Sequence, residues 1–264
     1  MRTQIYQVDA FTSRRFGGNP AVVCPLPRWP GDSILQEIAS ENNLAETAFL
    51  VRIDTGYYSI RCFTRTVEVP MSGHSTLAAA FVINTYLEPW LEWIRFVCIS
   101  GEFTVQHRFG QYALAYPVRV YLKAPPPDGL SEALGRLPSQ FYEGAFHLAV
   151  FNSEEELRAL QPRFPELATV SPSGLIATAP ARDPNVDFVS RFFAPRMGID
   201  EDPATGISHC MLAPYWAARL ERNVLDARQI SRRGADLRCE VRGDLVFISG
   251  RCALYLEGTI EVAV

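Results

Sequence analysis

The sequence predicts an α+β fold that is rich in strands. Most apolar stretches are short and are bounded by turn residues, which is typical of strands. Each half of the chain also contains one segment that is apolar on nearly every side, at 75–86 and at 207–220. Such segments are typical of helices enclosed by other structure. Strands grouped with a single buried helix in each half favour an α+β fold over a doubly wound parallel sheet.

The first half begins with strand-like segments at 5–8 and 21–24, separated by a turn of Gly, Asn and Pro residues at 16–20. Apolar residues at helical spacing between 34 and 39 follow Asp32, a residue type that can cap a helix. We expect this helix to end at Asn42 and Asn43. The segment 46–51 is expected to form a strand buried on both faces, paired with 57–63 as a hairpin.

The composition changes between residues 117 and 135, where a Pro-Pro-Pro-Asp-Gly stretch at 125–129 is the best linker candidate. We therefore expect two lobes, residues 1–116 and 117–264, with the last strand packing on the first lobe. Strands are predicted in the second lobe near 145–151, 174–179, 186–193, 237–241, 245–249 and 252–256. A short Glu-rich helix is predicted at 153–160.

Charge and cysteine content exclude several classes of partner. The 264 residues carry a net charge of -4, whereas nucleic acids and anionic membranes bind basic surfaces. The longest apolar run, Leu77 to Ile83, is far shorter than the roughly 20 residues that cross a bilayer. The six cysteines form no CxxC pair, which argues against structural zinc and for free thiols. We expect a cytoplasmic protein whose partner is a small anionic substrate bound in a locally positive pocket.

An internal repeat is the most informative feature of the chain. In each half an Arg-x-Phe triplet is followed by a Glu, then a Gly five residues later, then a Ser at the second position after the Gly and an apolar helix. The matching residues are Arg61, Phe63, Glu68, Gly73 and Ser75 in the first half and Arg191, Phe193, Glu201, Gly206 and Ser208 in the second. A repeat of this kind predicts two halves with related structures.

The two glycines precede the two buried helices. A helix N-terminus has unpaired N–H groups and roughly half a unit of positive charge, so it attracts anions. A glycine there lets a carboxylate approach the backbone closely. If the halves are related by a pseudo-twofold axis, both helices would point into one cleft. The alternative is that Gly73 and Gly206 form tight turns before core helices.

Six short stretches give the chain a family resemblance. They are VDAFT at 8–12, GNPAV at 18–22, NLAETAF at 43–49, GHSTLA at 73–78, RFFAP at 191–195 and EDPATG at 201–206. In this order they resemble the PhzF-type, or phenazine-biosynthesis-like, isomerases and, more distantly, the diaminopimelate epimerase fold. The resemblance implies two similar lobes, each a rolled mixed β-sheet around a central helix, with the active site in the cleft between them. It also implies no metal, no organic cofactor and a homodimer.

The resemblance assigns roles to individual residues. A glutamate matching Glu46 moves a proton between ring carbons of dihydrohydroxyanthranilate in the phenazine enzyme, and residues matching His74 and Asp202 line the same pocket. We expect these three to be catalytic. The expected substrate-binding residues are Asn19, Ser72, Gly73, Ser75, Thr205, Gly206, Ile207 and Ser208.

Each catalytic candidate also has a purely structural interpretation. Glu46 could be an exposed surface acid, although its place at the start of a buried strand would desolvate it and suit a group that both accepts and donates a proton. His74 could be a capping or core histidine. Asp202 could cap the second helix. The remaining histidines are expected to be structural.

Two departures from the family pattern leave alternatives open. Thiol-based epimerases have a cysteine on each side of the cleft, but this chain has Ser72 and no cysteine at 201–207, which disfavours a two-thiol racemase. Ile207 stands where the PhzF pattern has serine, and this puts the phenazine substrate itself in question. The first hypothesis is a cofactor-independent isomerase that shifts a proton on a small carboxylated substrate. The alternatives are a cofactor-free racemase or epimerase, and a non-catalytic binding protein.

Overall fold

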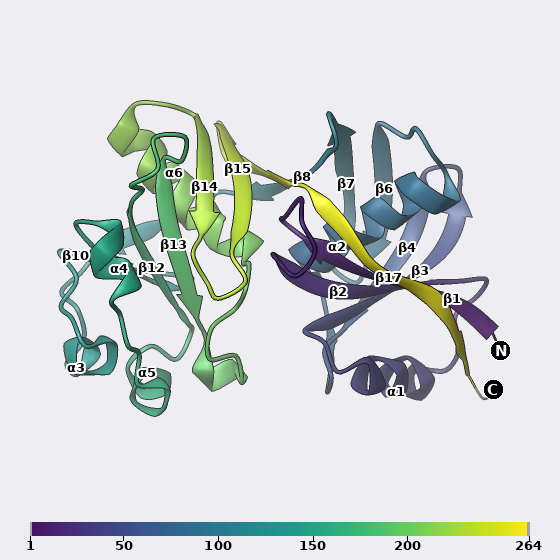
Figure 1. Cartoon of the computed structure of the whole chain (residues 1–264), viewed down its shortest axis with the longest axis horizontal. Helices are drawn as coiled ribbons and strands as arrows, with labels where there is room; N and C mark the ends of the chain where they lie inside the picture. The colour runs from purple at the N-terminus through teal and green to yellow at the C-terminus, as the bar shows by residue number, and fades with distance from the viewer. Residues whose placement is uncertain (1, 263–264) are drawn as a thin grey trace. The chain divides into compact units, whose positions relative to one another are not determined.

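The computed structural model describes residues 2–262 and is a mixed fold composed mostly of strands (Figure 1). This confirms the strand-rich α+β class. The chain divides into two compact units. One contains the residues up to Ala115 together with those from Ser249 onward, and the other contains Tyr116–Ile248.

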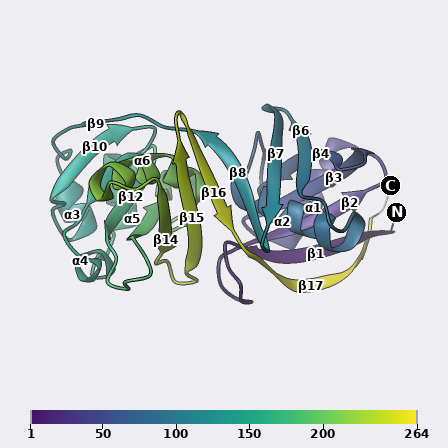
Figure 2. The same ribbon diagram turned by 90° about the horizontal axis from the view of Figure 1, so that it is seen from above.

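The first unit contains two α-helices and a short π-helical turn between its strands. Its strands are β1 Arg2–Ala10, β2 Asn19–Leu26, β3 Glu46–Asp54, β4 Tyr57–Phe63, β5 Glu68–Val69, β6 Trp93–Cys98, β7 Gly101–Arg108, β8 Gln111–Pro117 and β17 Cys252–Glu261; its helices are α1 Asp32–Asn42, α2 Gly73–Val82 and the π-turn Ile83–Leu87. β17 runs antiparallel to β1 (Figure 2). From β1 the pairing continues through β2, β3, β4, β6 and β7 to β8.

Helices cover both faces of the β2–β3 region, so these strands are apolar on both sides. Phe49 of β3 packs with Leu35 and Ile38 of α1 in one core cluster. Ala48 and Leu50 alternate with Phe49 and are therefore directed to the opposite face, where α2 packs on the sheet. Eight of the ten residues of α2 are buried. A helix enclosed by a curved sheet needs small residues, and the three consecutive alanines at 78–80 meet this need.

The second unit is built on the same principle. Its strands are β9 Tyr121–Lys123, β10 Gln140–Gly144, β11 His147–Val150, β12 Leu175–Pro180, β13 Phe188–Phe193, β14 Val224–Gln229, β15 Ala235–Arg242 and β16 Leu245–Gly250; its helices are α3 Leu130–Leu134, α4 Glu154–Arg158, α5 Phe164–Val170 and α6 His209–Leu220, with 3₁₀ turns at Pro195–Met197 and Gly206–Ser208. Trp216 of α6 donates a hydrogen bond of 3.0 Å to Thr178 of β12 and stacks on Phe188.

The internal repeat is confirmed by the order of strand pairings. From β1 through β2, β3, β4 and β6 to β7, neighbouring strands are antiparallel, parallel, antiparallel, parallel and antiparallel. The series from β10 through β11, β12, β13 and β14 to β15 has the same alternation. In each series the buried helix, α2 or α6, lies in the chain just after the strand that carries the Arg-x-Phe triplet.

The repeated charged residues form the same bidentate ion pair in both units. Arg61 donates from Nε and Nη2 to the two carboxylate oxygens of Glu68, at 2.8 and 2.6 Å. Arg191 donates in the same way to Glu201, at 2.8 and 2.9 Å. Each guanidinium also lies over the phenylalanine ring of its own triplet, at 5.2 and 4.8 Å. The repeat thus encodes one structural ion pair in each unit, and both of its glutamates are bound by arginine.

Two local expectations need correction. Asp32 does not cap α1, because Gly31 is the N-cap and Asp32 instead pairs with Arg61. The second buried helix does not start at its glycine. Gly206 begins a 3₁₀ turn, and the α-helix starts at His209. The Ser208 hydroxyl donates to the Thr205 carbonyl, at 2.7 Å, and this bond tightens the turn.

The six cysteines are unpaired thiols, of which Cys98 and Cys252 are half-buried and the others buried. No helix within residues 2–262 has the length and apolar character needed to cross a membrane. Over the same residues, no group of three or more His, Cys, Asp or Glu side chains is arranged to hold a metal ion.

Candidate functional site

Glu46 lies at the start of β3, on the face of the sheet that α2 covers. It has the same strand parity as Ala48 and Leu50, and its side chain is 16% exposed. The Ser75 hydroxyl, from the first turn of α2, donates a hydrogen bond of 2.9 Å to Glu46 Oε2. The local fold therefore holds one carboxylate oxygen in place, at a largely buried position.

Ser75 is fully buried and also lies 3.4 Å from the sulfur of Cys62. Cys62 belongs to β4, directly opposite Ala48. Burial, with a second contribution from the charge of Glu46, raises the pKa of the Cys62 thiol well above its ordinary value. Cys62 therefore stays protonated, and a thiolate mechanism at this position is disfavoured.

His74 is the second residue of α2 and is nine-tenths buried. Its Nδ1 lies 3.3 Å from the Ser72 hydroxyl, while its Nε2 faces Glu46 Oε2 at 3.9 Å, too far for a hydrogen bond. This Nε2 atom is buried and has no hydrogen-bond partner among residues 2–262. An imidazole nitrogen and a carboxylate oxygen thus face one another without a hydrogen bond between them.

The N-terminus of α2 completes this first group. Ser72 is the N-cap, and its side chain makes no capping hydrogen bond to the first turn, which begins at Gly73. Free N–H groups at this end favour an anion. Asn19, at the start of β2, is fully buried. Ala21, two residues after Asn19 in β2, pairs with Glu46. Because alternate residues of a strand point to the same face, Asn19 and Glu46 are directed to the same face of the sheet.

A second group of predicted residues lies in the other unit. The Thr205 hydroxyl donates to Asp202 Oδ2, and the Thr205 amide donates to Oε1 of Gln229 at 2.8 Å. The Thr205 carbonyl accepts from Ser208, and it lies 2.9 Å from Nδ1 of His209. Asp202 and Thr205 are thus held in a hydrogen-bonded loop. The hydroxyl hydrogen of Ser208 is therefore already used in a hydrogen bond within this loop.

The other two predicted residues lie in the 3₁₀ turn that follows. Gly206 is buried, and Ile207 is half-buried beside the fully buried Ser208. The predicted site residues therefore form two groups. Asn19, Glu46, Ser72, Gly73, His74 and Ser75 lie in the first unit, and Asp202, Thr205, Gly206, Ile207 and Ser208 lie in the second.

Two residues of the second group were not singled out from the sequence. Gln229 ends a strand that alternates apolar and polar residues, and a polar residue at its end is a weak signal. His209 follows Ser208 directly and is completely buried. Burial lowers the pKa of His209 to about 4. The ring is therefore neutral at physiological pH, with Nδ1–H donating to the Thr205 carbonyl.

The buried His209 makes stability depend on pH. Its pKa is about 4 in the folded protein and ordinarily about 6.5 when unfolded, so between these values the unfolded chain binds more protons. The free energy of unfolding should therefore fall as pH drops from about 6.5 to about 4, by about 3 kcal/mol from this group. Urea unfolding at a series of pH values checks this. His209→Asn should remove most of the pH dependence in that window, and an unchanged slope would contradict the assignment.

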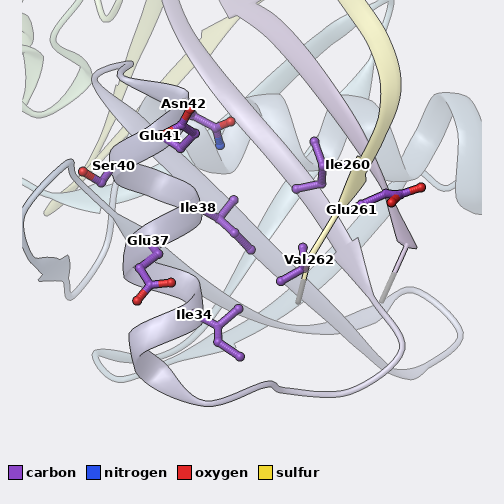
Figure 3. Close-up of a pocket in the computed structure, with 9 residues that line it drawn as sticks. All are labelled: Ile34, Glu37, Ile38, Ser40, Glu41, Asn42, Ile260, Glu261 and Val262. Atoms are coloured by element: carbon purple, nitrogen blue, oxygen red, sulfur yellow. The ribbon is translucent and has the colours of Figure 1, made fainter. Parts of the chain in front are cut away.

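A solvent-exposed hollow of about 670 Å³ lies elsewhere in the first unit, between α1 and the end of β17 (Figure 3). Figure 3 shows Ile38 of α1 pointing toward Ile260 of β17. The lining residues are Ile34, Glu37, Ile38, Ser40, Glu41, Asn42, Ile260, Glu261 and Val262. None of them is a predicted site residue. Their only charged groups are three carboxylates, which do not suit an anionic substrate.

The fold is similar to that of solved epimerase structures. A hydroxyproline epimerase from Agrobacterium vitis has a TM-score of 0.60 over 98% of this chain and 92% of that one, at 12% identity, which shows likeness of fold alone. The chain belongs to the PhzC-PhzF family of phenazine biosynthesis-like proteins, whose model matches residues 8–258. The resemblance found in the six sequence stretches is thus confirmed.

The similarity to individual family members extends over whole chains. A Pseudomonas aeruginosa protein named as an uncharacterized isomerase is 44% identical, over 99% of this chain and all of its own. The crystal structure of a PhzF-family phenazine biosynthesis protein from Enterococcus faecalis has a TM-score of 0.95 and 38% identity, over 99% of this chain and all of that one.

Proposed function

We propose that the protein is a cofactor-independent isomerase in which Glu46 removes a proton from one carbon of a small carboxylated substrate and returns it to another. The observation that carries the proposal is the arrangement around Glu46. This largely buried carboxylate has one oxygen fixed by Ser75 and faces an unpartnered imidazole nitrogen at the open N-terminus of α2. Two relatives are named as uncharacterized isomerases, and these names support the same class of reaction.

The proton shift assigned to these residues needs no oxidant or reductant. The Glu46 carboxylate takes the proton, and the electron pair left on carbon is delocalised towards the substrate's carboxyl or enol oxygen. The N–H groups at the start of α2 stabilise this developing negative charge. We assign the Ser72 hydroxyl as donor to Nδ1 of His74, which places the ring hydrogen on Nε2. The protonated Glu46 then delivers the proton to the second carbon.

The difference between the repeats supports a single acid–base group. Thr47 pairs with Phe63 in β3–β4, and Leu175 pairs with Phe193 in β12–β13, so the repeat aligns Glu46 with Gly174. Gly174 carries no acid, and its φ of +100° is one that other residues rarely adopt. A two-base racemase would need a second proton-transfer group, and the repeat does not supply one at this position.

Replacing Gly174 tests how strictly the second unit excludes a side chain there. An added Cβ would lie 3.0 Å from the Phe192 ring and 3.3 Å from the Phe193 carbonyl. Together with the positive φ, this predicts that Gly174→Ala lowers the free energy of unfolding by about 1–3 kcal/mol. Urea unfolding measures the change. Gly198→Ala, also at positive φ but with open space around its Cβ, separates backbone strain from crowding.

We further propose that the Asp202 group of the second unit binds substrate, with the N–H groups near Gly206 binding its acid group and Asp202 contributing a polar wall. Asp202→Asn should then alter turnover. We also propose that the protein is a homodimer in the cytoplasm. Sedimentation would give about twice the 29.5 kDa chain mass for a dimer.

The test is incubation of the wild-type protein in D₂O with small unsaturated or enolisable carboxylates, including dihydrohydroxyanthranilate, followed by product analysis. An isomerase places deuterium on a new carbon and moves the double bond. A racemase places it on the original carbon with inversion of configuration. Ligand binding without any exchange would identify a binding protein and contradict the proposal.

A further inference from the structure

Gln229, the last residue of β14, is completely buried and bonded to the loop that contains Asp202. Its Oε1 accepts from the Thr205 amide at 2.8 Å. Its Nε2 donates to the Asp202 carbonyl at 2.7 Å and to the Thr205 hydroxyl at 3.3 Å. One side chain therefore contacts both ends of this four-residue loop. Being buried, it does not reach a substrate.

These partners fix the orientation of the Gln229 amide. A backbone N–H can only donate and a backbone carbonyl can only accept, so the oxygen must face Thr205 N and the NH₂ must face Asp202 O. The Thr205 hydroxyl then receives a hydrogen from Nε2 and directs its own hydrogen to Asp202 Oδ2. The chain of donors runs in one direction, from Gln229 through Thr205 to Asp202, and it holds the Asp202 carboxylate as an acceptor.

The turn after Gln229 bonds to the same loop. The Ser231 hydroxyl donates to the Pro203 carbonyl at 2.7 Å and accepts from the Gly234 amide at 3.2 Å. The loop from Asp202 to Thr205 is thus attached at Asp202, Pro203 and Thr205 to the end of β14 and the turn that follows it. This attachment defines the position of Asp202 more strictly than a surface loop would allow.

We propose that Gln229 is a positioning residue that fixes the place of Asp202 and the direction of its hydrogen bond. The inference rests on the proposed function, in which Asp202 contacts the substrate. Gln229 acts only through Thr205 and Asp202. Its removal should change turnover more than it changes the fold of the unit.

Two variants separate the two functions of the Gln229 amide. Gln229→Met keeps the size and removes all three bonds, whereas Gln229→Glu keeps an acceptor for the Thr205 amide and loses the NH₂ donor. Gln140→Met is the matched control, because Gln140 lies in the same unit and accepts hydrogen bonds from Tyr142 and Tyr215, outside the site.

Hydrogen–deuterium exchange of the Thr205 amide and steady-state kinetics are the two readouts. Thr205 should exchange about tenfold faster in Gln229→Met, the usual effect of one lost buried hydrogen bond, and near the wild-type rate in Gln229→Glu. Turnover should fall by about tenfold or more in both variants, with kcat affected more than KM. A merely structural role would not give lost turnover with retained Thr205 protection.

Four results distinguish the claims. Unchanged Thr205 exchange in Gln229→Met, or wild-type turnover in Gln229→Glu, would overturn the positioning role. An equal loss of turnover in Gln140→Met would overturn it too. If Thr205 loses protection in Gln229→Met but the wild-type protein exchanges no proton with any carboxylate, the hydrogen-bond arrangement stands and the proposed function fails instead.

Discussion

Glu46→Gln should lower kcat by about 10²–10⁴, the usual contribution of a general acid–base group. The substitution keeps the size of the side chain and an oxygen that can accept from Ser75, so the fold should be preserved. Substrate affinity should stay close to that of the wild type, because binding is assigned to the N–H groups of α2 and not to the Glu46 carboxyl. Steady-state kinetics together with equilibrium binding measure both quantities.

Two control variants make this expectation specific. Ser75→Ala removes the hydrogen bond that fixes Glu46 Oε2, together with the contact to the Cys62 sulfur, and it should lower kcat by about tenfold. Glu37→Gln removes a carboxylate from the exposed side of α1 and should leave turnover unchanged. A Glu46→Gln protein with more than about a tenth of wild-type kcat would contradict the assigned role of this residue.

Arg191→Met should lower the free energy of unfolding by about 3–5 kcal/mol, because it leaves Glu201 buried without its partner. The Arg191 side chain is 13% exposed and that of Glu201 is 21% exposed. Arg191 also donates to the carbonyls of Leu157 and Leu160, at 3.3 and 3.1 Å, so its loss removes these two hydrogen bonds. The unpaired charge and the lost hydrogen bonds act in the same direction.

The repeat supplies a matched control for this prediction. Arg61→Met breaks the equivalent ion pair in the first unit, where Arg61 is 23% and Glu68 31% exposed. Water screens this pair more, so its loss should cost about 1–2 kcal/mol. Urea unfolding of both variants measures the difference. Equal destabilisation by the two substitutions would show that burial does not set the strength of the ion pair.

The sequence predicted the buried helices well because their signal is local. The apolar residues around Leu77 and those around Trp216 cannot be placed on a surface without exposing one face. The paired Arg-x-Phe triplets predicted related halves for the same reason. Strand β7 was missed because Val105 is its single fully buried residue, so its apolar alternation is weak.

The first group of site residues was named from the sequence through the family resemblance carried by the stretches at 43–49 and 73–78. The contact between Glu46 and Ser75 was not predictable, because it joins residues 29 positions apart. The bonds from Gln229 to Asp202 and Thr205 were not predictable. They join residues 27 and 24 positions apart, and they depend on how β14 pairs with β13.

The most direct test of the central claim is deuterium incorporation from D₂O, compared between the wild type and Glu46→Gln with one carboxylate substrate. Mass spectrometry and NMR of the recovered product locate each deuterium. Proton transfer by Glu46 predicts one carbon-bound deuterium at a new position in the wild-type reaction and none above background with Glu46→Gln. Deuterium appearing at the same rate with both proteins would show that another group moves the proton.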